Sequence, residues 1–311
     1  MKFHIPNVLP GRRDGEFSIH LRACYNIPTY VREQPHTGIF FDVPILGLEH
    51  HDSINLNMSN SKWFSVRPAR GVAALRLFCF PHVGGGASVF NQWQPAWIPG
   101  NVELWTVRLP GREQRLSEKP FRRMTPLVDA LYEAMATQLS GRYAFYGHSL
   151  GAVVAFEVAR KIERQGGQGP IRLLVSAHSA PHVGLSRPPF HTLPDKEFVD
   201  ALRRLAGTPQ EALENEDLMG LMMVSLRADF EVDETYCYEA GKPLECPISA
   251  FGGMDDADVS QADLEAWRIQ TSQQFSLQMM EGDHFFIFRS QEFVYRLSQE
   301  LKADLQEPIK M

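Results

Sequence analysis

One pentapeptide in the middle of the chain combines residue types that support covalent acyl chemistry. Gly147-His148-Ser149-Leu150-Gly151 follows the apolar run 143–146 and opens a helical pattern that continues to about Gln165. A G-x-S-x-G sequence in a tight turn between a strand and a helix presents its serine hydroxyl to a substrate, and the glycines leave room for the turn. The helix behind it adds backbone N–H groups and the positive end of its dipole. This pattern predicts that Ser149 is a nucleophile rather than a residue that only caps a buried helix.

A serine nucleophile needs a base, and His284 fits this role best. It lies in Gly282-Asp283-His284-Phe285, directly after a predicted strand over 275–279. The last loop of a parallel sheet reaches the sheet's carboxyl edge, where a base can meet the serine. His82 and His148 are competitors, but each lies beside a turn glycine in a motif with another use, and neither follows Ser149 in the chain.

The base in turn needs a carboxylate that orients it, and three acids crowd one loop. The segment Gly252-Gly253-Met254-Asp255-Asp256-Ala257-Asp258 follows a predicted strand over 247–251. The chain order Ser, Asp, His is that of α/β-hydrolases. We predict Asp256, three residues past the glycine pair, with Asp255 as the alternative. Asp283 adjoins His284 but points the other way along an extended chain, which argues against it.

Two backbone N–H groups are predicted to hold the oxyanion that acyl transfer creates. One belongs to Leu150, the residue after the nucleophile, and the other comes from the loop after the domain's first strand. That loop reads Phe80-Pro81-His82-Val83-Gly84-Gly85-Gly86, and its glycines allow close backbone approach, so Val83 is the expected second donor. No Gly-Lys-Ser/Thr follows these glycines, which argues against a phosphate-binding loop.

The elements that must position these residues alternate between strands and helices. Apolar runs predict buried strands over 75–80, 102–107, 143–146, 171–177, 247–251 and 275–279. Helical patterns occupy 125–139, 149–165 and 260–270 and follow His284, and Ser260 with Asp263 predicts a capping box. The alternation predicts an α/β fold with a mostly parallel sheet and helices on both faces.

One connection is longer than a single crossover needs. The chain between residues 177 and 247 contains two helical patterns, at 195–206 and 217–230. We therefore expect a helical lid, inserted over the sheet's edge at about 184–240. The second pattern carries Met219, Met222 and Met223, which suit either a pocket for varied acyl chains or ordinary helix packing.

Composition and charge set further limits. The chain has 311 residues, of which 44% are hydrophobic, and 31 basic against 37 acidic side chains give a net charge of −6. This is an ordinary globular composition, and its mild acidity argues against nucleic acid as a partner. Four cysteines without a CxxC pair are typical of a reduced protein. No signal peptide or membrane-spanning run is visible, so we expect a soluble cytoplasmic protein that binds no membrane.

Residues 1–57 differ from the rest. Helical periodicity is absent there, and prolines recur at Pro6, Pro10, Pro28, Pro35 and Pro44. The 254 residues from Met58 to the end are a natural size for one α/β-hydrolase domain with a lid. We therefore expect one catalytic domain over 58–311, preceded by a poorly structured extension or by a stretch upstream of a mis-called start.

Taken together, the motifs resemble one family, the type II (editing) thioesterases that accompany polyketide synthases and non-ribosomal peptide synthetases. The similarity runs from about Trp63 to about Leu301. Three residues depart from the family pattern, namely Ala257 for a usual Pro, Leu150 for a frequent Met and Val83 for a frequent Ala. The matching segments are Leu77-Phe78-Cys79-Phe80-Pro81-His82-Val83-Gly84-Gly85, Leu109-Pro110-Gly111-Arg112-Glu113, Gly147-His148-Ser149, Leu226-Arg227-Ala228-Asp229-Phe230, Tyr236, Pro243-Leu244-Glu245-Cys246-Pro247 and Gly282-Asp283-His284-Phe285-Phe286.

The resemblance implies a serine hydrolase with Ser149 as nucleophile, His284 as base, Asp256 as its orienter, and Val83 and Leu150 as oxyanion donors. The family hydrolyses acyl groups from the phosphopantetheine thiol of carrier proteins, which clears stalled or misprimed synthases. The substrate carries the phosphopantetheine, so we expect no bound cofactor or metal, and we expect a monomer. The alternatives are a medium-chain acyl-thioesterase of fatty-acid synthesis, a general carboxylesterase and an inactive hydrolase-fold binding module.

Charge suggests where a carrier protein docks. Residues 184–240 hold 12 acidic and 5 basic side chains, a net charge of −7, whereas 108–123 hold 6 basic and 2 acidic ones, a net charge of +4. The resemblance implies acidic carriers, so we predict docking near Arg112, Arg115, Arg122 and Arg123. The alternatives are a solvated loop with partly paired charges and, for Arg112, a structural role near the active site.

Overall fold

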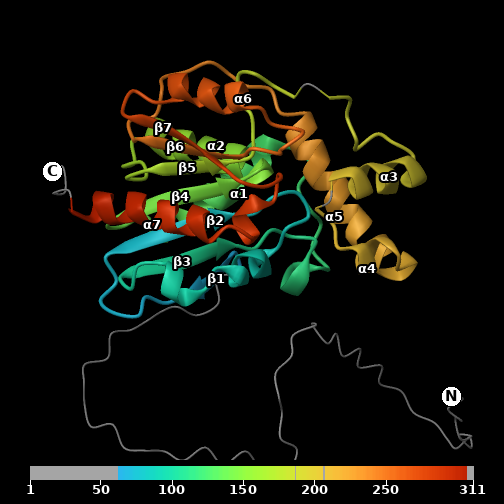
Figure 1. The fold of residues 1–311 in the computed structure, drawn as a ribbon, viewed down its shortest axis with the longest axis horizontal. Coiled ribbons are helices and arrows are strands. Elements are labelled where there is room, and N and C mark those ends of the chain that lie inside the picture. Colours follow the sequence, from blue (N-terminus) through green and yellow to red (C-terminus); the bar gives the residue numbers. More distant parts are fainter. Residues whose placement is uncertain (1–61, 186, 206, 307–311) are drawn as a thin grey trace, which may run out of the picture. The chain divides into compact units, whose positions relative to one another are not determined.

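A seven-stranded sheet forms the centre of the part of the chain that the computed structural model describes, residues 62–185, 187–205 and 207–306 (Figure 1). The predicted extension at 1–57 lies outside these residues. The strands run in the order β1-β3-β2-β4-β5-β6-β7. Six of them pair in parallel, as predicted: β2 (Leu75–Phe80), β3 (Val102–Val107), β4 (Tyr143–His148), β5 (Leu173–Ser176), β6 (Ile248–Gly253) and β7 (Phe275–Met280).

A short edge strand was not among the predicted elements. This strand, β1 (Phe64–Arg67), pairs antiparallel with β3, with Phe64 opposite Val107. Four residues are too few for an alternating pattern to stand out in the sequence. The addition leaves the predicted fold class intact, because every strand that carries a candidate site residue lies in the parallel part of the sheet.

Helices cover both faces of the sheet. On one face, α1 (Met124–Met135), α2 (Leu150–Arg164) and α6 (Gln261–Glu265) share an apolar core with the strands. On the other face, α7 (Gln291–Gln306) packs against the 3-10 turns that follow β2, and Figure 1 shows α7 in front of the strands. Ser260 and Asp263 form the predicted capping box, although α6 ends at Glu265 and continues as a 3-10 turn. None of the described helices is long and apolar enough to cross a membrane.

Three helices occupy the long connection between β5 and β6. They are α3 (Asp195–Leu205), α4 (Gln210–Leu213) and α5 (Glu216–Glu234), which confirms the two helical patterns predicted there. They lie beside the end of the sheet (Figure 1) and have an apolar cluster of their own that includes Phe198, Leu202 and Met219. Met222 and Met223 pack against this cluster, which supports the packing role for these methionines.

Candidate active site

The candidate nucleophile lies in a strained turn between β4 and α2. Ser149 has a φ of 54° and a ψ of −128°, a combination that side-chain-bearing residues rarely adopt. A Cβ atom on Gly147 would lie 2.2 Å from the Gly151 carbonyl oxygen, and one on Gly151 would lie 2.1 Å from the Phe80 carbonyl oxygen. Both glycines are therefore required for the turn to close, as the sequence predicted.

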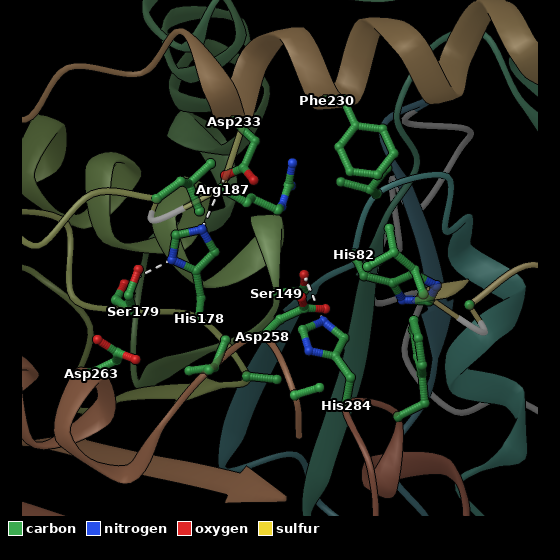
Figure 2. A pocket seen from close by; sticks show the side chains of 18 of the residues that line it. His82, Ser149, His178, Ser179, Arg187, Phe230, Asp233, Asp258, Asp263 and His284 are labelled. Carbon is green, nitrogen blue, oxygen red and sulfur yellow. Dashed lines mark hydrogen bonds and ion pairs between the residues drawn. The ribbon is translucent and has the colours of Figure 1, made fainter. Parts of the chain in front are cut away.

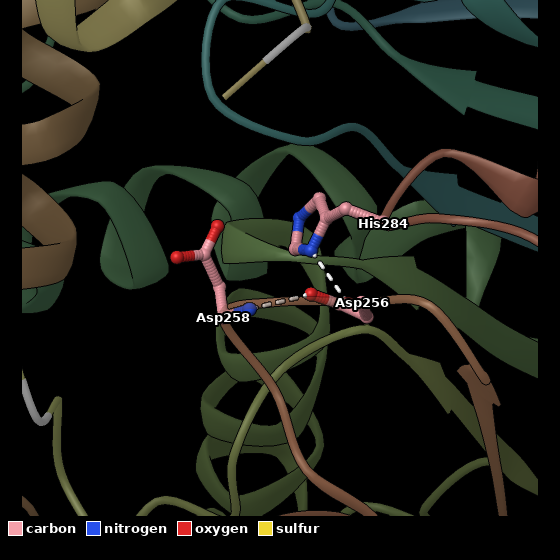
Figure 3. A group of neighbouring side chains, drawn as sticks. All are labelled: Asp256, Asp258 and His284. Carbon is pink, nitrogen blue, oxygen red and sulfur yellow. Dashed lines mark hydrogen bonds and ion pairs between the residues drawn. The ribbon is translucent and has the colours of Figure 1, made fainter. Parts of the chain in front are cut away.

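The structure brings Ser149, His284 and Asp256 into one hydrogen-bonded row. The His284 Nε2 atom lies 3.0 Å from Ser149 Oγ, and its Nδ1 atom lies 2.8 Å from Asp256 Oδ2. The other oxygen, Asp256 Oδ1, accepts the Asp258 N–H at 2.9 Å (Figure 3) and the Val259 N–H at 3.2 Å. The carboxylate side chain is 1% exposed, and its bonds fix the imidazole with Nε2 toward the serine.

The two alternative acids lie elsewhere. Asp255 is exposed, and its backbone N–H donates to the Gly282 carbonyl. Asp283 accepts the Phe285 N–H at 2.9 Å and pairs with Arg289 at 3.2 Å. Neither carboxylate contacts the imidazole of His284 within the described structure, so the geometry favours Asp256.

The two alternative bases are buried and neutral. Burial, reinforced by the nearby His284, lowers the pKa of His82 to about 3 and holds the pKa of His148 well below its ordinary value. The Nδ1 atom of His148 lies 2.9 Å from Ser176 Oγ, and both rings contact Phe285 and Phe288 edge-on. These two histidines therefore pack beside the row and do not provide a second base.

The loop that carries Val83 is held in place by the lid helix. Asp229 of α5 accepts the Gly84 N–H at 2.8 Å and binds the Arg112 guanidinium through both oxygens, at 2.6 and 2.7 Å. Arg112 also donates to the Gly85 carbonyl oxygen at 3.1 Å. The sequence matched Arg112 and Asp229 to family motifs but did not pair them, because they lie 117 residues apart.

Glu113 braces the same loop from its other side. Its carboxylate accepts the N–H groups of Ala87 and Ser88 at 3.0 and 2.9 Å. A Cβ atom on Gly86 would lie 2.3 Å from this carboxyl group, and Glu113 itself has a φ of 48°. The loop is therefore supported by two neighbouring side chains of the segment 109–113. This is the structural role given above as the alternative for Arg112, whereas the part of Glu113 was not predicted.

Only two of the four arginines predicted to dock a carrier protein have exposed side chains. Arg112 and Arg115 are 7% and 4% exposed, which favours the structural alternative for Arg112 and leaves neither side chain accessible to a carrier protein. The side chains of Arg122 and Arg123 are 55% and 57% exposed, and both pair with Glu231 of α5. Part of the positive charge of 108–123 is thus matched by the negative charge of the lid.

A cavity of about 350 Å³ opens beside Ser149 and His284. Figure 2 shows His82 and Phe230 on one side of this cavity, and His178, Asp233 and Arg187 on the other. Apolar residues that line the cavity include Val83, Leu202, Leu226, Phe230 and Phe285. The second side is polar, and neither His178 nor Asp233 was singled out by the sequence. The position of His178 could have indicated its role, because it lies just after the end of a parallel strand, where ligands bind in α/β sheets.

One cluster in the described residues has the composition of a metal site. Ligand atoms of Asp256, Asp258 and His284 lie within 4.8 Å of one another (Figure 3). An ion bound by all three would compete with the hydrogen bond between His284 and Asp256. We therefore interpret the cluster as part of the hydrogen-bonded row.

The fold and the row define a class of protein. A serine in a strained strand-to-helix turn, a histidine after the last strand and an acid after the preceding one are the features of an α/β-hydrolase. Residues 75–301 match the sequence profile of the thioesterase domain family. The chain therefore belongs to the thioesterase family and is a thioesterase, which confirms the resemblance found in the sequence.

Relatives with known names agree with this assignment. The chain is 40% identical over 246 residues to the gramicidin S biosynthesis protein GrsT of Aneurinibacillus migulanus, covering 79% of this chain and 96% of the relative. It is 36% identical over 233 residues to thioesterase PikA5 of Streptomyces venezuelae, covering 75% and 82%. The solved structure of the type II thioesterase BorB from the borrelidin biosynthetic cluster superposes with a TM-score of 0.70 at 33% identity, covering 78% and 98%.

Proposed function

We propose that this thioesterase hydrolyses acyl groups from the phosphopantetheine arm of carrier proteins, and so clears stalled or misprimed polyketide or peptide synthases. The row of Ser149, His284 and Asp256 at the cavity carries the proposal. The named relatives support the setting, since they belong to gramicidin S biosynthesis and to the borrelidin cluster. The acyl group would lie in the cavity beside Ser149, and the pantetheine arm would link it to the carrier protein at the surface.

The geometry supports a two-step mechanism. In the first step Ser149 Oγ attacks the thioester carbonyl carbon while His284 Nε2 takes its proton, and Asp256 stabilises the imidazolium. The imidazolium then protonates the departing pantetheine sulfur, which leaves an acyl-serine. In the second step His284 takes a proton from water, the hydroxide attacks the ester, and Ser149 recovers its proton as the acid leaves. Side chains and water supply every proton in this scheme.

The oxyanion of both steps would be held by the N–H groups of Val83 and Leu150. Within the part of the chain that the structure describes, neither N–H donates to another protein group. Leu150 opens α2, so its N–H lies at the positive end of the helix. Val83 lies in the loop that Asp229, Arg112 and Glu113 hold from the back, which supports a preorganised donor.

The direct test is Ser149→Ala on an acyl-carrier thioester, with release of the thiol as the readout. We expect kcat to fall by about 10⁴-fold or more, because loss of a triad nucleophile leaves only binding and oxyanion stabilisation. The matched control is Ser298→Ala, a buried serine on α7 that donates to the Trp97 carbonyl far from the row, and it should retain normal kcat. Full turnover by Ser149→Ala would end the proposal.

A fluorophosphonate probe tests the same residue without a substrate. It should label the wild-type chain at Ser149 and leave Ser149→Ala unlabelled. A wild-type chain that resists labelling would instead support an inactive binding module.

Fatty-acid synthesis is the second candidate setting. The chain is 31% identical over 225 residues to the medium-chain S-acyl fatty acid synthase thioesterase of Rattus norvegicus, covering 70% of this chain and 83% of the relative. We expect a higher kcat/KM for short acyl groups on a peptide or polyketide carrier than for decanoyl groups on a fatty-acid carrier. The reverse order would assign the enzyme to fatty-acid synthesis, and equal hydrolysis of simple oxygen esters would indicate a carboxylesterase.

A further inference from the structure

A second imidazole–carboxylate pair lines the cavity of Ser149. The strand β5 ends at Ser176, and Ala177 then adopts a φ of 51°, a strained value for a residue with a side chain. The next residue, His178, is held at three points: Nε2 lies 3.0 Å from Asp233 Oδ1, Nδ1 lies 2.7 Å from the Ser179 carbonyl oxygen, and its own carbonyl accepts the Trp267 Nε1–H at 2.8 Å. The strain and the bonds together aim this imidazole into the cavity (Figure 2).

The partners of His178 require it to be protonated. A backbone carbonyl and a carboxylate only accept hydrogen bonds, so both ring nitrogens must donate. Burial alone would lower the pKa of His178, but the charge and hydrogen bond of Asp233 and the bond to the Ser179 carbonyl outweigh it and raise the pKa above the ordinary value. The side chains of His178 and Asp233 are 9% and 8% exposed. They therefore form a buried ion pair, and the desolvation of its two charges is costly.

The pair lies close to where the acyl carbon must sit. Strands β4 and β5 are neighbours, with His148 opposite Ser176, and parallel strands lie about 4.8 Å apart. Ser149 follows His148 directly, and His178 follows Ser176 by two residues. A polar group within a few bonds of the thioester carbonyl can therefore reach this wall.

The wall offers both hydrogen-bond acceptors and donors to a ligand. Both N–H groups of His178 are committed, and Ser179 Oγ donates to the Gly184 carbonyl at 3.1 Å. Arg187 lines the same side, and its Nη1 atom pairs with Glu234 while its other nitrogens can still donate. The lone pairs of Asp233 and of Ser179 Oγ are left to accept from a ligand. A hydrocarbon chain here would desolvate them without compensation, whereas a hydroxyl group would satisfy them.

We propose that this polar wall, made of His178, Ser179, Asp233 and Arg187, is a subsite for acyl chains that carry a hydroxyl group near the thioester carbonyl. The proposal rests on the proposed function, because it assigns a substrate class to the same cavity. The ion pair positions the accepting oxygen of Asp233, and the hydroxyl group of the acyl chain donates to it. The opposite apolar side receives the remaining carbons.

The test compares 3-hydroxyhexanoyl-pantetheine with hexanoyl-pantetheine, two thioesters that differ by one hydroxyl group. We expect the wild-type kcat/KM to favour the hydroxylated substrate about tenfold or more, since a site built to bind a hydroxyl group discriminates against its absence. In the double variant His178→Leu/Asp233→Leu both charges are removed together, so no unpaired charge stays buried. In this variant the ratio of kcat/KM for the hydroxylated substrate to kcat/KM for the plain one should fall to about one or below it.

The matched control is His191→Leu. His191 pairs with Glu234 of the same lid helix at 2.7 Å but does not line the cavity of Ser149. It removes a histidine–carboxylate contact of the lid without touching the polar wall, so the selectivity ratio should stay at the wild-type value. If the double variant fails to fold, Asp233→Asn replaces it, because its amide oxygen still accepts from His178 while the charge is lost, and the ratio should fall several-fold.

Two results would contradict the proposal that the polar wall is a subsite for hydroxylated acyl chains. One is a wild-type ratio near one, and the other is an unchanged ratio in the variants of Asp233. In both cases the enzyme would still hydrolyse the two thioesters, which separates this failure from that of the proposed function. If the chain lacked thioester hydrolysis, on which the proposed function rests, the wild type would hydrolyse neither, and the carrier comparison above tests the biosynthetic setting separately.

Discussion

Two imidazole–carboxylate pairs lie at one cavity of the described structure, and the partner of the second ring nitrogen distinguishes their chemistry. His284 lies 2.8 Å from Asp256, and His178 lies 3.0 Å from Asp233. The far nitrogen of His284 meets the Ser149 hydroxyl group, which can donate a proton, whereas the far nitrogen of His178 meets a carbonyl oxygen, which cannot. The first imidazole can therefore be neutral and act as a base, and the second is held protonated. The group at the far nitrogen, not the carboxylate, sets the role of each histidine.

The pairs also differ in the elements that they join. His284 and Asp256 both follow strands of the sheet, so their geometry depends on the body of the fold alone. His178 follows β5 but Asp233 belongs to α5, so this pair joins the body to the lid. The same helix contributes Asp229 to the loop of Val83. The positions of the proton-transfer residues thus stay independent of the lid, while the pocket wall and the oxyanion loop depend on it.

The largest expected effect separates the two histidines directly. His284→Gln should lower kcat by about 10⁴-fold or more, because no other neutral imidazole contacts Ser149 in the described structure. His178→Gln should lower it by about tenfold or less, since His178 takes no part in proton transfer. Steady-state release of thiol from acetyl-pantetheine measures both. Losses of equal size would show that the two pairs do not differ in the way proposed.

The sequence predicted the pair of His284 and Asp256 but not the pair of His178 and Asp233. Ser149, Asp256 and His284 each follow a strand that is apolar enough to recognise, and the order of the three restricts the choice. The structure adds what the sequence left open, that Asp256 rather than Asp255 faces the imidazole. Local patterns contain this information because each residue is positioned by its own strand and turn.

The lid contacts could not be predicted in this way. Asp229 meets Arg112 and Asp233 meets His178 across 117 and 55 residues, and no local period links such partners. The opposite charges of 108–123 and 184–240 were visible in the sequence, but charge alone does not distinguish an external partner from an internal one. The structure shows internal pairing at Arg112, Arg122 and Arg123, through Asp229 and Glu231.

The second-largest effect tests how much the contact between Asp229 of the lid helix and Arg112 stabilises the fold. Asp229→Ala leaves the Arg112 charge buried without its partner and the Gly84 N–H without an acceptor, so the free energy of unfolding should fall by about 3–5 kcal/mol. It should also lower kcat more than it raises KM, because the loop of Val83 loses a support that matters in the transition state. Urea unfolding and steady-state kinetics measure the two effects.

A second ion pair of the lid provides the control. Asp195 binds Arg227 at 2.6 Å, but the Asp195 side chain is 82% exposed, so Asp195→Ala should cost less than about 1 kcal/mol. A similar cost for both variants would mean that burial does not distinguish these pairs.

The third effect is a pH dependence carried by the second pair. The pKa of His178 is higher in the folded chain than its unfolded value of about 6.5, so its stabilisation is complete below pH 6.5 and is lost as the pH rises through the folded pKa. Asp233→Asn removes the charge that raises this pKa, whereas Arg187, which opposes the shift, is unchanged. The stability difference between wild type and variant should therefore be largest near pH 6 and shrink toward pH 9. Urea unfolding at several pH values measures it, and a difference that stays constant would contradict a protonated His178.

The smallest effect concerns Arg122 and Arg123, which pair with Glu231 of the lid but keep more than half of their side chains exposed. Arg122→Gln with Arg123→Gln should raise KM several-fold for a carrier-bound substrate and leave KM for a small pantetheine thioester unchanged, because both side chains are more than half exposed. Glu231→Gln is the control, since it breaks the same ion pairs but leaves both arginines available. It should keep or lower KM for the carrier. If Glu231→Gln raised KM as much as the arginine variants, the arginines would act by holding the lid rather than by binding the carrier.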